Sequence, residues 1–187
     1  MEEVELQVRR DEVLEAIKIH FGAIFGADIL AEVEGHRELV NPYTIAMAER
    51  SAAAFRESSV LHGLRLESRI LGAISEVLAE HEVLLAPTLA TRGFVADDDY
   101  VDHGLRVGEE ELAEWVLAML TPLFNIASRC PVLNAPSGFA DSGVPTSLQI
   151  VGRPYEDASV FRVGAAYKRQ RPWLDVPERR PLQTMTS

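Results

Sequence analysis

Apolar residues near the start of the chain recur at helical spacing. Leu14, Ile17, Phe21 and Ile24 are three or four residues apart, which places them on one face of a helix. The first part of the chain is therefore predicted to be an amphipathic helix that buries this face.

The same spacing predicts a long second helix over residues 43–80. Asn41 is a typical helix cap, and Pro42 fits the first turn, where its missing N–H costs nothing. We expect the helix to bend or break near Gly63. Its apolar positions form two stripes, one of Ala48, Ala52 and Phe55 and one of Leu64, Leu71, Ile74 and Leu78.

Three shorter apolar runs read as strands. They are residues 83–87 (VLLAP), 131–136 (PVLNAP) and 146–151 (TSLQIV), each bounded by turn-forming residues. Residues 88–108, rich in glycine and aspartate, are predicted to form a loop, and residues 137–143 a turn.

Two more helices complete the pattern. One is predicted from Glu109, with Pro122 as a kink or stop, and the other from Asp157. Their inward-facing residues are Leu112, Val116, Met119 and Leu123 in the first, and Val160, Val163 and Tyr167 in the second.

Strands that alternate with amphipathic helices predict an α/β layer architecture with a helical N-terminal segment. We expect the domain to cover residues 1–176 and residues 177–187 to form a flexible tail. Three strands are few for a sheet and leave open edges, so the pattern favours a larger partner surface.

Composition narrows the function classes. The net charge is −11, and an acidic chain repels phosphate backbones, so we expect no nucleic-acid partner. No run approaches the roughly 20 apolar residues that span a bilayer, and no basic and apolar leader is present at the start. With one cysteine, Cys130, these features predict a cytoplasmic protein without a membrane association.

The second half of the chain carries an ordered series of landmarks. They are Thr121, Pro122 and Asn125; Pro131, Pro136 and Gly138; residues 143–145 (GVP); residues 149–152 (QIVG); Ala165 and Ala166; and, upstream, residues 81–88 (HEVLLAPT). Their order and spacing resemble the closing segment of amidase signature enzymes. The specific match covers about residues 80–173.

The resemblance implies a partial amidase-signature fold, in which a mixed β-sheet is flanked by helices. It also implies hydrolysis of a carboxylic acid amide C–N bond by a serine, assisted by a second serine and a lysine, without a cofactor or a metal. A small amide is the implied substrate. A serine needs such a base, and the developing oxyanion needs fixed donors.

The residues of that centre are not evident here. The only lysines are Lys18 and Lys168, and the only serine pair, Ser58-Ser59, has no flanking glycines to present backbone N–H groups. We therefore assign no catalytic residue and expect the chain alone to be inactive. Three hypotheses remain open: an amidase portion, a subunit completed by an N-terminal amidase half or by self-association, and a non-catalytic binding module.

The resemblance places a substrate-pocket wall at Thr121, Phe124 and Asn125. The alternative is that Thr121 and Asn125 satisfy backbone groups near a helix end. Residues 97–103 (DDDYVDH) offer oxygen and imidazole ligands to a metal ion, but a solvated acidic loop is the simpler interpretation. Cys130 lies among apolar residues, which indicates an inert thiol.

Overall fold

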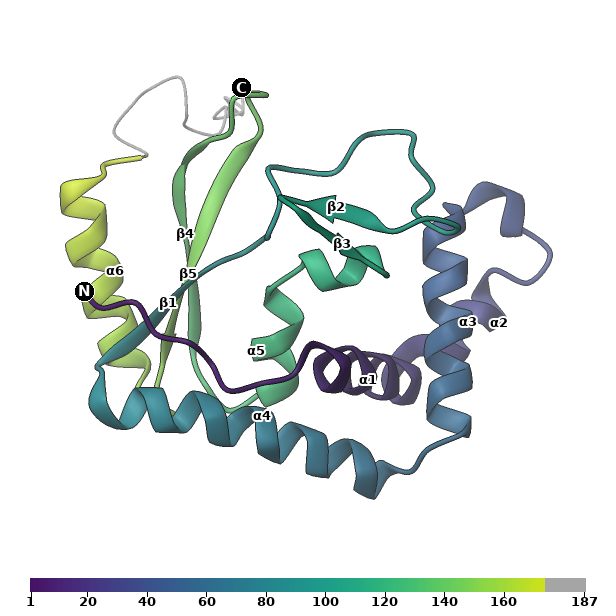
Figure 1. Ribbon diagram of the computed structural model, residues 1–187, viewed down its shortest axis with the longest axis horizontal. Helices are drawn as coiled ribbons and strands as arrows, with labels where there is room; N and C mark the ends of the chain where they lie inside the picture. The colour runs from purple at the N-terminus through teal and green to yellow at the C-terminus, as the bar shows by residue number, and fades with distance from the viewer. Residues whose placement is uncertain (174–187) are drawn as a thin grey trace, which may run out of the picture.

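The computed structural model describes residues 1–173, and it contains a three-stranded sheet between helices (Figure 1). The sheet is antiparallel in the order β1-β5-β4. Its strands are β1 (Val83–Pro87), β4 (Val132–Phe139) and β5 (Pro145–Gly152). The three predicted strands are thus confirmed, as is the α/β class, whereas the predicted tail at 177–187 lies outside the described residues.

Strands β4 and β5 are longer than predicted and form a hairpin. The register shifts between Pro136 and Gly138, and this irregularity lets β4 continue to Phe139. The turn is therefore shorter than the predicted 137–143.

Helices cover both faces of the sheet (Figure 1). On one face, α6 (Asp157–Gln170) packs its Val160 against Ile150 and Ala135. On the other face, Val151 and Leu84 join the larger core, which the other helices supply. Alternation along β5 decides this division, because neighbouring side chains of a strand point to opposite faces.

The larger core is built on α4 (Val60–Glu80). Its buried face consists of Leu66, Ile70, Ile74 and Leu78, one residue every four. Leu64, which we predict in this stripe, is 50% exposed instead.

The predicted helix over 43–80 is two helices, α3 (Pro42–Arg56) and α4, and the break lies before Gly63. Ser59 has an extended backbone, and its Oγ accepts a hydrogen bond from the N–H of His62 at 3.1 Å, which caps α4. Gly63 lies inside α4 and faces Ile19 of α1.

The first predicted helix also divides. It comprises α1 (Arg10–Phe21), a π-helical turn η1 (Gly22–Gly26) and α2 (Ala27–Glu32), followed by the short η2 (Arg37–Leu39). The π-turn adds a residue per turn and rotates Ile24 off the predicted face, so its side chain is 55% exposed.

The helix predicted from Glu109 is wrong. A hairpin of β2 (Leu105–Val107) and β3 (Glu110–Leu112) replaces its first turn, because Gly108 adopts a positive φ of 61° and turns the chain back. A 3₁₀ turn, η3 (Trp115–Ala118), and the helix α5 (Thr121–Ala127) follow. Pro122 stands in the first turn of α5, so it begins a helix rather than ending one.

Two leucines of α4 test this assignment of the core. Leu66 is 1% exposed and Leu64 is 50% exposed. We expect Leu66→Ala to lower the free energy of unfolding by about 2–5 kcal/mol, because it opens a cavity, and Leu64→Ala to lower it by about 1 kcal/mol or less. Urea denaturation followed by circular dichroism measures both, and equal losses would contradict the orientation of α4.

Candidate functional site

A polar cluster forms where β1 ends. The hydroxyl of Thr88 lies 3.1 Å from the hydroxyl of Ser147 and 3.3 Å from the Ser147 carbonyl oxygen. Beside them, the buried side chain of Gln149 donates from Nε2 to the carbonyl oxygen of Pro87 at 2.9 Å. The end of β1 is thereby fixed to β5 by side chains as well as by the backbone ladder.

The same strand end holds the start of α5. The N–H of Leu120 donates to the carbonyl oxygen of Thr88 at 3.0 Å, and the N–H of Ala90 donates to the carbonyl oxygen of Ala118 at 2.8 Å. Thr121, the first residue of α5, therefore directly follows a residue bonded to the strand end. Segments about thirty residues apart in the sequence meet at this point.

The three predicted pocket residues lie on α5 and differ in exposure. Phe124 is 3% exposed and belongs to the larger core. Thr121 is half-buried, and Asn125 is exposed one helical turn later, on the same side of the helix. The structure thus brings Thr121 and Asn125 together and directs Phe124 inward.

Within residues 1–173, the side chains of Thr121 and Asn125 form no hydrogen bond. The alternative, in which they satisfy backbone groups, finds no supporting bond in this part of the chain. The pocket role of Thr121, Phe124 and Asn125 stays a prediction.

Thr88 and Ser147 are site residues that the sequence pattern does not single out. Thr88 ends the family-like motif at 81–88, so its place after a buried strand is a usable signal. Ser147 lies within a strand, and only the register Pro87↔Leu148 sets it opposite the strand end.

The serines and lysines that we considered for catalysis have other partners or lie elsewhere. Lys18 is half-buried and forms an ion pair with Glu114. Lys168 is exposed on α6. The Ser59 hydroxyl accepts from the backbone of His62, and the ring of His62 contacts Glu15 at 2.9 Å. In the described part of the chain no serine hydroxyl is hydrogen-bonded to a histidine ring or to a lysine.

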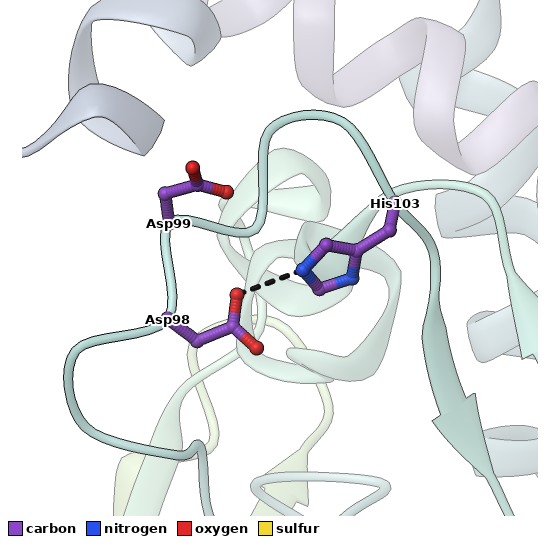
Figure 2. Close-up of side chains that lie close together, drawn as sticks. All are labelled: Asp98, Asp99 and His103. Carbon is purple, nitrogen blue, oxygen red and sulfur yellow. Dashed lines mark hydrogen bonds and ion pairs between the residues drawn. The ribbon is translucent and has the colours of Figure 1, made fainter.

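The acidic loop gathers three groups of the kind that bind metal ions. Ligand atoms of Asp98, Asp99 and His103 lie within 4.8 Å of one another. Figure 2 shows the Asp98 carboxylate facing the His103 ring, with Oδ1 2.8 Å from Nε2. The other ring nitrogen, Nδ1, lies 3.0 Å from the carbonyl oxygen of Gly104.

These hydrogen bonds favour a protonated ring. Acceptor oxygens face both ring nitrogens, so the Gly104 carbonyl first, and then the Asp98 carboxylate, raise the pKa of His103. The backbone N–H of Tyr100 and the contact with His103 lower the pKa of Asp98. A protonated imidazole has no lone pair for a metal ion, so the arrangement supports a solvated loop.

Cys130 is part of the larger core, with 9% of its surface exposed. Burial raises the pKa of its thiol, and a protonated thiol is a poor nucleophile. This agrees with the inert thiol predicted from its neighbours.

No family model matches the chain. The A-type subunit of the glutamyl-tRNA(Gln) amidotransferase of Thermosynechococcus vestitus is 24% identical over 149 residues, which are 80% of this chain and 27% of that protein. The corresponding protein of Chloroflexus aggregans is 30% identical over 122 residues, or 65% of this chain and 23% of that protein. The chain therefore spans about a quarter of the length of these curated relatives.

A solved structure of similar fold is that of a bacterial aryl acylamidase belonging to the amidase signature enzymes. It matches with a TM-score of 0.69 at 23% identity and covers 95% of this chain and 38% of that chain. The relatives and the shared fold together confirm the resemblance to the amidase signature family. In the described residues no helix is long and apolar enough to cross a membrane.

The pair of Asp98 and His103 predicts a pH response of the loop. Because the pKa of His103 is raised, the stabilisation from its protonated form is complete below its ordinary pKa of 6.5 and is lost as pH rises through the raised value. The stabilisation from Asp98 is present above its ordinary pKa of 3.8 and is lost as pH falls through its lowered value.

An NMR titration of the His103 ring measures this. We expect a pKa above 6.5 that falls in Asp98→Asn and is unchanged in the matched variant Asp102→Asn. An identical His103 pKa in Asp98→Asn would contradict the pairing.

Proposed function

We propose that this chain, a relative of the amidase signature enzymes, supplies the scaffold and one pocket wall of a site that hydrolyses a carboxylic acid amide C–N bond. The proposal adds that the Ser-Ser-Lys catalytic centre lies on another stretch of polypeptide. The observation that carries it is the junction of β1 with α5, where unpaired polar side chains stand on a rigid base.

In this proposal Thr121 and Asn125 contact the substrate. A hydroxyl and a carboxamide without partners are able to bond an amide, which has one acceptor and N–H donors. Phe124 holds α5 in place from the core side, so it shapes the wall through packing. A small-molecule amide is the proposed substrate.

The proposed absence of a nucleophile in this chain rests on the surroundings of its candidates. Lys18 is committed to Glu114, and the Ser59 hydroxyl to the cap of α4. An activated serine needs a base within hydrogen-bond reach, and none of the described serines has one in a lysine or histidine side chain. The chain alone is therefore proposed to be inactive.

The free edge of β1 supports a partner polypeptide. Within residues 1–173, β1 pairs with β5 alone, so one of its backbone edges is unpaired. A groove of about 960 Å³ runs along this strand from the segment at residues 1–4 to Ser147 and Leu148. Leu85 lines it and is 42% exposed. Unpaired strand edges with exposed apolar side chains readily add another strand.

The proposed partner is an N-terminal amidase half, or a second copy of the chain. The relatives from T. vestitus and C. aggregans are both named as subunits, which supports a partner. We propose no nucleic-acid partner, because the net charge is −11, and no membrane partner. A cytoplasmic location is proposed from the single, buried cysteine.

A second candidate is a component of an amidotransferase. The names of the same two relatives favour it, because both are amidotransferase subunits. Release of free ammonia from an amide, without transfer, would favour the simple amidase over this candidate. A non-catalytic binding module is the outcome if no amide is cleaved in any assembly.

The test of the proposed function is amide hydrolysis by the purified chain, with and without a co-expressed N-terminal amidase half. We expect turnover only in the mixture, because the nucleophile lies on the added half. Hydrolysis by the chain alone, retained after repurification, would contradict the proposal.

In the active mixture, single substitutions test the pocket wall. We expect Thr121→Val and Asn125→Ala each to lower kcat/KM roughly three- to tenfold, as expected for the loss of one hydrogen bond to substrate. The matched control is Ser75→Ala, an exposed position on α4, which should leave kcat/KM unchanged. Unchanged kinetics in both wall variants would remove α5 from the site.

A further inference from the structure

A small cavity lies within the helical segment, apart from the sheet and α5. Its volume is about 150 Å³. The residues around it come from α1, η1, α2, α3 and η3 and are nearly all apolar: Phe21, Phe25, Gly26, Ile29, Tyr43, Thr44, Met47, Ala48, Ser51 and Trp115.

The cavity contains a buried polar group without a partner. Ser51 is 1% exposed, and its hydroxyl has no hydrogen-bond partner among the described residues. Buried hydroxyls are almost always hydrogen-bonded, so such a group calls for an explanation. A ligand in the cavity that bonds Ser51 provides one.

Close packing beside the cavity holds Ser51 in place. A Cβ atom on Gly22 would overlap the backbone carbonyl of Ser51, so only glycine lets η1 approach α3 this closely. The approach occurs in a π-helical turn, a rare element that is frequent at functional sites. The backbone that carries Ser51 is therefore held rigidly by its neighbour.

The size and the lining of the cavity define the ligand. Apolar cavities of about 150 Å³ accommodate one benzene ring. Phe21 and Phe25 lie 4.9 Å apart between ring centroids, and Tyr43 and Trp115 lie 5.6 Å apart edge to face, so aromatic rings flank the space. Phe25 is 38% exposed, which gives a ligand access past its side chain.

We propose that this cavity binds a single-ring aromatic molecule that carries one hydrogen-bonding group, with the ring among the aromatic side chains and the polar group on Ser51. The site is independent of the proposed amidase function, because no lining residue belongs to α5 or to the sheet.

Phenol and toluene are the probes, since they differ in one hydroxyl and have similar size. Trp115 lines the cavity, and the chain has two tryptophans, so Trp173→Phe leaves Trp115 as the only indole reporter. We expect phenol to change Trp115 fluorescence saturably. Ser51→Ala should weaken phenol binding roughly three- to tenfold and leave toluene binding unchanged.

A cavity-filling variant separates this site from binding elsewhere. Thr44→Leu places a larger side chain in the cavity and should abolish the response to both probes, whereas Ala23→Leu, exposed on η1 and outside the lining, should preserve it. Circular dichroism verifies folding, and Ile29→Phe replaces Thr44→Leu if the latter unfolds.

Three results would overturn the proposal: no saturable response to phenol, a response that survives filling of the cavity, or equal phenol affinity in Ser51→Ala and the unsubstituted chain. Loss of binding in the filled variant together with weakened phenol binding in Ser51→Ala would support it.

Discussion

Strand β5 is the element on which the rest of the molecule depends. It pairs with β1 on one side and β4 on the other, and its side chains enter two separate cores. Ile150 faces α6 and Val151 faces the larger core, and both are 0% exposed. A shift of one residue in its register would exchange these faces and expose both cores, so packing on two sides fixes the sheet strongly.

The candidate site follows from this fixed strand. Ser147 and Gln149 of β5 hold the end of β1, and Thr88 at that end holds the residue before α5. A polar face on α5 is thus attached to the most buried part of the sheet through a short series of hydrogen bonds. Precise placement of binding groups requires such a rigid support.

Sequence patterns identify the elements that are long and periodic. The strand runs and α6 follow from apolar spacing, because burial on one or two faces dictates that spacing. The start of α5 is predicted wrongly because Pro122 has opposite meanings at the two ends of a helix, and only the hairpin before it decides between them. The break at Ser59 is hidden because both flanking segments are strong helix formers.

Site features that depend on tertiary contacts are less accessible. Thr121 and Asn125 belong to a family-like motif, whereas Ser147 and Ser51 gain their settings from segments distant in sequence. Ser51 reads as an ordinary helix residue, and its cavity exists only because η1 packs against α3. Spacing along one segment carries no information about such an approach.

The central claim is that this chain forms part of an amidase site whose nucleophile lies elsewhere. The most direct measurement is to treat the active mixture of this chain and an N-terminal amidase half with a fluorophosphonate, which phosphonylates activated serines, and to locate the adduct by mass spectrometry. We predict one adduct, on a serine of the added half, and an unmodified mass for this chain. An adduct on any serine of this chain that tracks with loss of activity would contradict the claim.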